Sequence, residues 1–216
     1  MNVEIARQFM EKHVTDREHA LHVENLSLQL FDQLRELHHG GEIERQLLQC
    51  AAYLHDIGCV VSYQKHHVNS LRIILDANLP SFRSREKQMI ANIARYHRKS
   101  TPKHKHYEFA SLPPDDQTTV KKMSALLRIA DALDRSHGSK IQSLQCTLVN
   151  SKCYCVLSAK EDCPEEKSAV LKRKDLFRDV FGVNFRIAVE IEEKSDDSSH
   201  IYQEMAPVYN ELQTIG

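Results

Sequence analysis

The spacing of apolar residues changes once along the 216-residue chain, and this change most constrains the fold. From residue 3 to about residue 137, apolar residues recur every three or four positions, which is typical of amphipathic helices. After residue 138, the segments 141–149 and 153–159 alternate polar with apolar or β-branched residues, a helical pattern covers 164–181, and 183–191 is again strand-like. We therefore predict a mainly α fold, with a helical bundle over 1–137 and a small α+β (β-β-α-β) unit with a C-terminal tail over 138–216.

Breaks in the periodicity predict where the helices begin and end. Gly40-Gly41 ends the first helical region, 3–37, and Thr15 followed by Glu18 fits a capping box that would start a second helix inside it. The other expected helices cover 42–56, 66–76, 84–98 and 117–136. Residues 99–116 are expected to form a long loop, 194–199 a polar break, and a short helix is expected from Ile201.

Composition excludes several classes of protein. Lys and Arg number 29 against 30 Asp and Glu, a net charge of −1 that argues against a dedicated nucleic-acid binder. No apolar run approaches the roughly 20 residues that span a bilayer, and the first residues lack the pattern of a secretory signal. The six Gly form neither a P-loop nor a Rossmann fingerprint, and the six Cys form no CxxC. We expect a cytoplasmic protein with reduced thiols.

The 13 His suggest metal chemistry. His55-Asp56 ends the amphipathic segment AAYLHDIG, and Asp131 lies in the apolar helix LLRIADALDR, where an unpaired carboxylate is costly to bury. His19 precedes them, and His66 or His67 and then His97 lie at helix ends between them. The order H–HD–H–H–D offers six ligands, enough for one or two divalent ions such as Mn, Fe, Mg, Co or Ni.

These motifs resemble the HD superfamily of metal-dependent phosphohydrolases, and more closely the C-terminal HD-like region of the exopolyphosphatase / guanosine pentaphosphatase (Ppx/GppA) family. The segments that carry the resemblance are 19–34, 47–75 with LHDIG, 85–99 with RYHRK, 126–137 with LLRIADALDRSH, and the tail 172–182. The resemblance implies an HD-type helical bundle. Full-length members carry an actin-like phosphatase domain before this region, whereas this chain is expected to stand alone, so the usual exopolyphosphatase activity is not implied.

The resemblance also implies roles for the candidate residues. His19, His55, Asp56 and Asp131 would form the core metal site, and His97 with His66, or with its rival His67, would complete a second. Asp56 and His55, with Lys65 and Arg98, are the catalytic candidates. Basic residues that flank the ligands are candidates for binding substrate phosphate: Lys65, Arg98, Lys99, Arg128 and Arg135.

The predicted function is hydrolysis of a phosphomonoester or phosphodiester, in a nucleotide or another polyphosphorylated small molecule, by a metal-activated water. The β-β-α-β unit would cover the active site or form a homodimer interface. One alternative is a regulatory module that binds metal and an anion such as polyphosphate or a guanosine polyphosphate without turnover, and another is a purely structural domain. Locally, Asp131 could instead pair with Arg128 or Arg135, and Lys172-Arg173-Lys174 could be either a solvated face or a polyanion patch.

Overall fold

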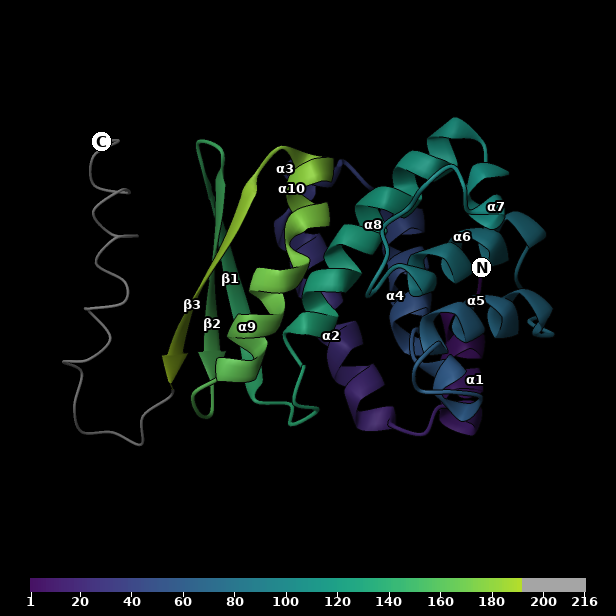
Figure 1. Cartoon of the computed structure of the whole chain (residues 1–216), viewed down its shortest axis with the longest axis horizontal. Helices are drawn as coiled ribbons and strands as arrows, with labels where there is room; N and C mark the ends of the chain where they lie inside the picture. Colours follow the sequence, from purple (N-terminus) through teal and green to yellow (C-terminus); the bar gives the residue numbers. More distant parts are fainter. Residues whose placement is uncertain (192–216) are drawn as a thin grey trace.

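The structure, a computed structural model, describes residues 1–191, and it is mainly helical as expected (Figure 1). A three-stranded sheet follows the helical part. The helices of the helical part are α1 (Val3–His13), α2 (Arg17–Gln33), α3 (Arg35–His38), α4 (Glu42–Leu54), the 3-10 helix η1 (Ile57–Val60), α5 (His66–Asp76), α6 (Ser84–Arg95), α7 (Tyr107–Ala110) and α8 (Pro114–Ala132).

The C-terminal unit has the predicted β-β-α-β order. Strands β1 (Ile141–Val149) and β2 (Lys152–Ala159) pair antiparallel as a hairpin, and β3 (Asn184–Ile191) pairs parallel to β2. Helices α9 (Pro164–Arg173) and α10 (Asp175–Phe181) make the connection that a parallel pair requires and lie between the sheet and α8 (Figure 1). Cys153 and Cys155 share the buried face of β2, as their spacing predicts.

One cluster of buried apolar side chains runs through the helical part and the C-terminal unit. It includes Leu26 and Leu30 of α2, Leu126 of α8, and Leu157 and Phe185 of the sheet. Burial of apolar area is the main stabilising contribution to a fold of this size. The all-helical segment before residue 137 and the strand-containing segment after it thus share one continuous core.

Several element ends differ from the sequence prediction. The N-cap of α2 is Asp16, whose carboxylate accepts from the His19 N–H at 3.1 Å, so the expected capping box at Thr15 is wrong. Two parts of the expected loop 99–116 are helical, namely α7 and the start of α8. Pro114 can occupy the first turn of α8, because its missing N–H leaves no bond unmade there. The expected helix 164–181 is two helices that meet at Lys174, and α6 ends at Arg95, before His97. The predicted break at 194–199 and helix from Ile201 lie outside the described residues.

Helix α2 covers the outer edge of β1 with two glutamine side chains. The Leu144 N–H donates to Gln29 at 3.0 Å, the Gln33 amide donates to the Leu144 carbonyl at 2.8 Å, and the Cys146 N–H donates to Gln33 at 2.7 Å. Unpaired strand edges template association with other chains, and covering them is one way to prevent it. The sheet is thereby joined to the helix that carries His19.

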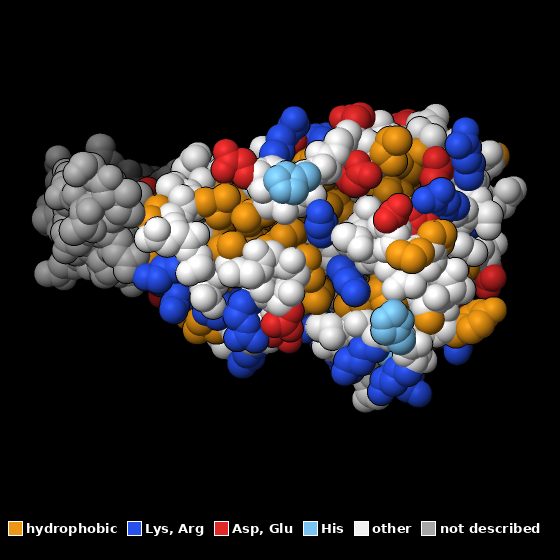
Figure 2. Space-filling model, turned by 90° about the horizontal axis from the view of Figure 1, so that it is seen from above, with side chains coloured by type: hydrophobic (Ala, Val, Ile, Leu, Met, Phe, Trp, Pro, Cys, Tyr) orange, Lys and Arg blue, Asp and Glu red, His pale blue; other side chains and the backbone are white. Residues whose placement is uncertain are grey.

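Acidic, basic and apolar side chains are interspersed on the face that Figure 2 shows, without a continuous basic stripe there. This agrees with the near-zero net charge of the sequence. Within residues 1–191, no helix combines the length and apolar character needed to cross a membrane.

Candidate metal centre

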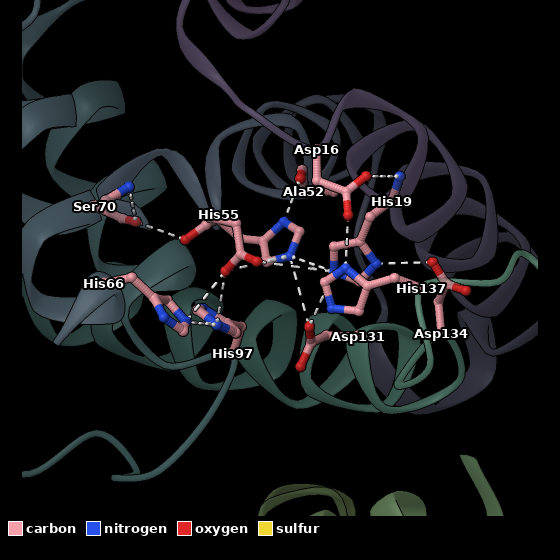
Figure 3. A network of polar contacts seen from close by, with 12 residues as sticks. Asp16, His19, Ala52, His55, His66, Ser70, His97, Asp131, Asp134 and His137 are labelled. Carbon is pink, nitrogen blue, oxygen red and sulfur yellow. Dashed lines mark hydrogen bonds and ion pairs between the residues drawn. The ribbon is translucent and has the colours of Figure 1, made fainter. Parts of the chain in front are cut away.

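Four imidazoles from four successive helical segments meet in the interior (Figure 3). His19 lies in the first turn of α2, His55 directly follows α4, His66 begins α5, and His97 follows the last turn of α6. All four side chains are at most 1% exposed. The structure thus brings together histidines that are up to 78 residues apart in the sequence.

Each imidazole is oriented by an acceptor at its Nδ1. Nδ1 of His19 lies 2.8 Å from Asp134 Oδ2, and the Nδ1 atoms of His55, His66 and His97 lie 2.7, 2.6 and 2.7 Å from the carbonyls of Ala52, Tyr63 and Ala94. Because a carbonyl or carboxylate can only accept, the proton of each neutral ring is on Nδ1. The Nε2 lone pair is then free to bind a cation, an arrangement typical of metal-ligating histidines.

Two carboxylates face the four Nε2 atoms. Oδ1 of Asp56 lies 3.2, 3.4 and 3.7 Å from Nε2 of His66, His97 and His55. Asp131 approaches from α8, with its Oδ1 3.5 Å from Nε2 of His19 and 3.6 Å from Nε2 of His55. Asp56 therefore lies between two groups of potential ligands, His19–His55–Asp56 and Asp56–His66–His97, within each of which the donor atoms are all within 4.8 Å of one another.

These groups fit divalent cations. Donors that share an ion at about 2.1 Å lie about 3.0 Å apart when their bonds are perpendicular, close to the observed separations. Nε2 of His66 faces Nε2 of His97 at 3.1 Å, and Nε2 of His19 faces Nε2 of His55 at 3.2 Å. Two lone pairs at this distance repel unless a proton or a cation lies between them. Asp56 Oδ1 is also buried without a hydrogen-bond partner, which is costly for a carboxylate oxygen.

The electrostatics of the cluster are strongly perturbed. Burial alone would lower the pKa of His19, but its bonds to Asp131 and Asp134 raise it to about 10. Burial lowers the pKa of His97 to about 3. Burial would raise the pKa of Asp131, but the Arg173 guanidinium and the bonds from His19 and His55 hold it well below its usual range. The cluster thus combines an anionic carboxylate with the neutral imidazole of His97, while His19 keeps a second proton that a cation would have to displace. Carboxylates and imidazoles together are a donor set suited to Mn²⁺, Fe²⁺ and related ions.

The turn after His55-Asp56 is fixed by close contact with α5. A Cβ on Gly58 would lie 2.1 Å from the His66 carbonyl oxygen and 2.5 Å from the Ser70 nitrogen, so only glycine fits there. The Ser70 hydroxyl accepts from the Gly58 N–H at 2.9 Å and donates to the His55 carbonyl at 2.6 Å. These contacts bring His55, Asp56 and His66 to one place.

The C-terminal unit contributes a cation to the same place. Nη1 of Arg173, at the end of α9, donates to Oδ2 of Asp131, the oxygen that faces away from the imidazoles. The sequence-based alternatives for Asp131, Arg128 and Arg135, do not pair with it. Of the Lys172-Arg173-Lys174 run, Arg173 is thus a contact of the centre rather than part of a solvated face.

Other predicted residues lie outside the cluster. The ring of His67 is directed elsewhere, with its Nδ1 buried and unpartnered, so the histidine of this pair that joins the cluster is His66. Lys65 is exposed, and Lys99 donates to the Gln64 carbonyl. Arg128 is buried and donates to the carbonyls of Arg173, Tyr96 and Lys99, so its donors are occupied structurally.

Arg98 and Arg135 both contact Tyr63, which lies beside His66. The Arg98 guanidinium lies 5.8 Å from the centre of the Tyr63 ring, which in turn is 5.6 Å from the ring of His66. Hydrogen bonds from Arg135 and Arg98 lower the pKa of the Tyr63 hydroxyl. Of the five phosphate-binding candidates, Arg98 and Arg135 are the two that contact Tyr63, whose ring lies next to that of His66.

Sequence reasoning missed the residues that orient the ligands. Asp134 is 1% exposed and holds His19, while the His137 ring stacks on His19 at 3.8 Å and bonds to Asp16. The signal for Asp134 was present, since it follows Asp131 by three residues within the expected helix 117–136, where residues at this spacing share a face.

Comparison with known proteins identifies the family of the chain. Residues 4–179 match the family described as Ppx/GppA phosphatase, domain III. The chain belongs to the Ppx/GppA phosphatase family. A guanosine-5'-triphosphate,3'-diphosphate pyrophosphatase from Pseudoalteromonas translucida (strain TAC 125) is 28% identical over 96 residues, which are 44% of this chain and 19% of that protein. The chain therefore matches only about a fifth of the length of that relative.

Proposed function

We propose that this Ppx/GppA family member is a metal-dependent phosphohydrolase of the HD superfamily, with one or two divalent ions held by His19, His55, Asp56, His66, His97 and Asp131. The observation that supports it best is the orientation of the four imidazoles. Every Nδ1 is held by an acceptor, and every Nε2 is directed at Asp56 or Asp131. A purely structural cluster has no need for four buried imidazoles with opposed lone pairs.

Some residues of the site would hold the ions, and others would bind the substrate. Divalent ions in such a site polarise a phosphoryl oxygen and lower the pKa of a bound water. His55 and Asp56 would fix the position of the ions, because Asp56 lies between both groups of ligands. Arg98 and Arg135, beside Tyr63, would neutralise charge on the phosphoryl group being transferred.

The proposed substrate is a phosphomonoester or phosphodiester in a nucleotide or another polyphosphorylated small molecule. The family name and the pyrophosphatase name of the relative support phosphate chemistry of this class. The named activity belongs to a protein of which this chain matches about a fifth, so the substrate of this chain has to be determined directly.

A second candidate is a regulatory module that binds metal and a polyphosphorylated anion without turnover. The contact between Arg173 and Asp131 favours it, since this cation neutralises the charge of one ligand carboxylate. Both candidates require metal, and only the enzyme requires turnover.

The first experiment is elemental analysis of the purified protein after reconstitution with Mn²⁺ or Fe²⁺. We expect about one or two ions per chain, and their loss in Asp56→Ala. Asp179→Ala, which removes an exposed carboxylate on α10, should retain the metal. Absence of metal in the wild-type protein would contradict both candidates.

A screen of phosphorylated compounds with the loaded protein then separates the two candidates. Turnover that disappears in Asp56→Ala and persists in Asp179→Ala supports the hydrolase. Metal-dependent binding of a nucleotide polyphosphate without turnover supports the regulatory module.

A further inference from the structure

Three of the six cysteines lie on the inner face of the hairpin that β1 and β2 form (Figure 1). Cys146 of β1 packs against the apolar core, and Cys153 and Cys155 of β2 are buried in it. All three are free thiols. A single cysteine in a core is ordinarily a small apolar residue. Three sulfurs on one face of two paired strands can react with one another, and we call them the hairpin thiols.

The strand register places Cys146 directly opposite Cys155. The Cys146 N–H donates to Gln33 of α2, away from β2, so this pair is of the non-hydrogen-bonded kind. The Cα atoms of such a pair are about 4.5 Å apart, within the range of about 4.4–6.8 Å that a disulfide spans. Cys153 is opposite Leu148 and therefore diagonal to Cys146, a separation of about 7–8 Å. The backbone thus favours a bond from Cys146 to Cys155.

The hairpin thiols differ in accessibility and in acidity. Cys146 is partly exposed, whereas Cys153 and Cys155 are at most 1% exposed. The thiols of Cys153 and Cys155 donate toward the Cys146 sulfur and lower the pKa of Cys146 to about 5, although burial opposes this. The same contacts, together with burial, raise the pKa of Cys153 and Cys155. The accessible sulfur is thus also the one that ionises most readily, and the thiolate is the reactive form of cysteine.

We propose that Cys146 and Cys155 form a reversible disulfide when the protein meets hydrogen peroxide, with Cys146 as the attacking thiolate. Its sulfur attacks one peroxide oxygen, the O–O bond breaks, and the released hydroxide takes up a proton to become water. This leaves a sulfenic acid on Cys146. The Cys155 sulfur then attacks the Cys146 sulfur, and the displaced hydroxide leaves as water with the Cys155 proton. Two thiols are oxidised, one peroxide is reduced to two waters, and a dithiol reverses the bond.

This site is separate from the metal centre. Among the described residues, the groups of three or more donors close enough to share an ion are those at the metal centre, and they do not include the hairpin thiols. The contact with α2 should survive oxidation, because Gln33 binds the backbone of Cys146 and not its sulfur. Disulfide formation and Mn²⁺ binding can therefore succeed or fail independently.

The test exposes the full chain, freed of metal with EDTA, to hydrogen peroxide and maps its cysteines by mass spectrometry after the remaining thiols are alkylated. Removing metal prevents it from converting peroxide into less selective oxidants. Cleavage after lysine separates the strands, because Cys146 is in peptide 141–152, and Cys153 and Cys155 are in peptide 153–160. We expect these peptides joined, at the sum of their masses less two hydrogen atoms, with the bond at Cys155 on fragmentation. A dithiol should release them.

Substitutions provide the controls. Cys146→Ser and Cys155→Ser should each abolish the joined peptides, whereas Cys153→Ala should retain them, because residue 153 is diagonal to residue 146. Cys59→Ser should oxidise as the wild-type protein does. Cys59 is also partly exposed, but burial raises its pKa to about 12, so it should remain a thiol in peroxide.

Three outcomes would overturn the proposal. Cys146 that is still a thiol after treatment would mean that the hairpin thiols only pack the core. Cys146 that is oxidised to an acid without pairing would mean that Cys155 does not reach it. A bond from Cys146 to Cys153 or to a second chain would contradict the register argument. Peptide mapping of the wild-type protein decides among these outcomes even if Cys155→Ser does not fold.

Discussion

At the scale of single residues, the metal centre depends on the acceptors behind its ligands as much as on the ligands. Asp134 Oδ2 holds Nδ1 of His19 at 2.8 Å, while its Oδ1 accepts from the Ser139 N–H at 2.8 Å. One carboxylate therefore orients an imidazole and also fixes the backbone of the segment that links α8 to the C-terminal unit. The other three imidazoles are oriented by backbone carbonyls, which side-chain substitution leaves in place.

Asp134→Asn tests this role. An amide in the same place can present its NH₂ group to His19 and release the ring from its present orientation. Removing a residue of this kind costs about 10- to 100-fold in metal affinity. Calorimetric titration with Mn²⁺ measures the change, and Asp179→Asn is the control on an exposed carboxylate. An Asp134→Asn protein with unchanged affinity would show that His19 is oriented by packing alone.

The sequence predicted that His55, Asp56, His97 and Asp131 lie together, because His55-Asp56 and His97 fall at helix ends and Asp131 is costly to bury without a partner. It could not choose between His66 and His67. These neighbours differ by about 100° around the helix, and the choice depends on where α5 begins. The contact of Arg173 could not be predicted either, because it joins Asp131 to a residue 42 positions away. Such a contact depends on how the C-terminal unit packs against the helices.

At the scale of elements, the turn from α4 into η1 and α5 brings three of the candidate ligands together. Gly58 is in this turn, and its backbone is in contact with the backbone of α5. The predicted helix 42–56 and the glycine that ends it are close to the observed elements, because both are determined locally. The cap of α2 and the start of α8 were less predictable, because adjacent polar residues and prolines can each begin a helix.

Gly58→Ala should destabilise the protein more than a glycine substitution usually does. The added Cβ would lie 2.1 Å from the His66 carbonyl oxygen, so η1 and α5 must separate. We expect a loss of about 2–3 kcal/mol in the free energy of unfolding, measured in urea, together with weaker Mn²⁺ binding. Gly41→Ala is the control, because the nearest atom to its added Cβ is a Glu44 side-chain oxygen at 3.7 Å. Equal stability of the two variants would mean that the turn can adapt without strain.

At the scale of the whole molecule, α8 connects the metal centre to the helices of the C-terminal unit. It carries Asp131, which faces the imidazoles on one side and Arg173 on the other, and the buried Arg128, which donates to the Arg173 carbonyl. The apolar core also continues from the helices into the sheet. The sequence predicted two units with a boundary at residue 137, but a change of periodicity carries no information on whether such units unfold separately.

Metal binding should therefore stabilise the sheet as well as the helices. An ion that binds only the folded state at 100 times its dissociation constant adds about 2.7 kcal/mol to the free energy of unfolding. If the molecule unfolds as one unit, amide exchange of β2 should slow by the same factor as that of α4 when Mn²⁺ is added, because both then exchange through global unfolding. Hydrogen exchange followed by mass spectrometry measures both segments in one sample. Slower exchange in α4 with no change in β2 would show that the β-β-α-β unit opens independently, so that the contacts of Arg173 and Arg128 do not couple it to the metal centre.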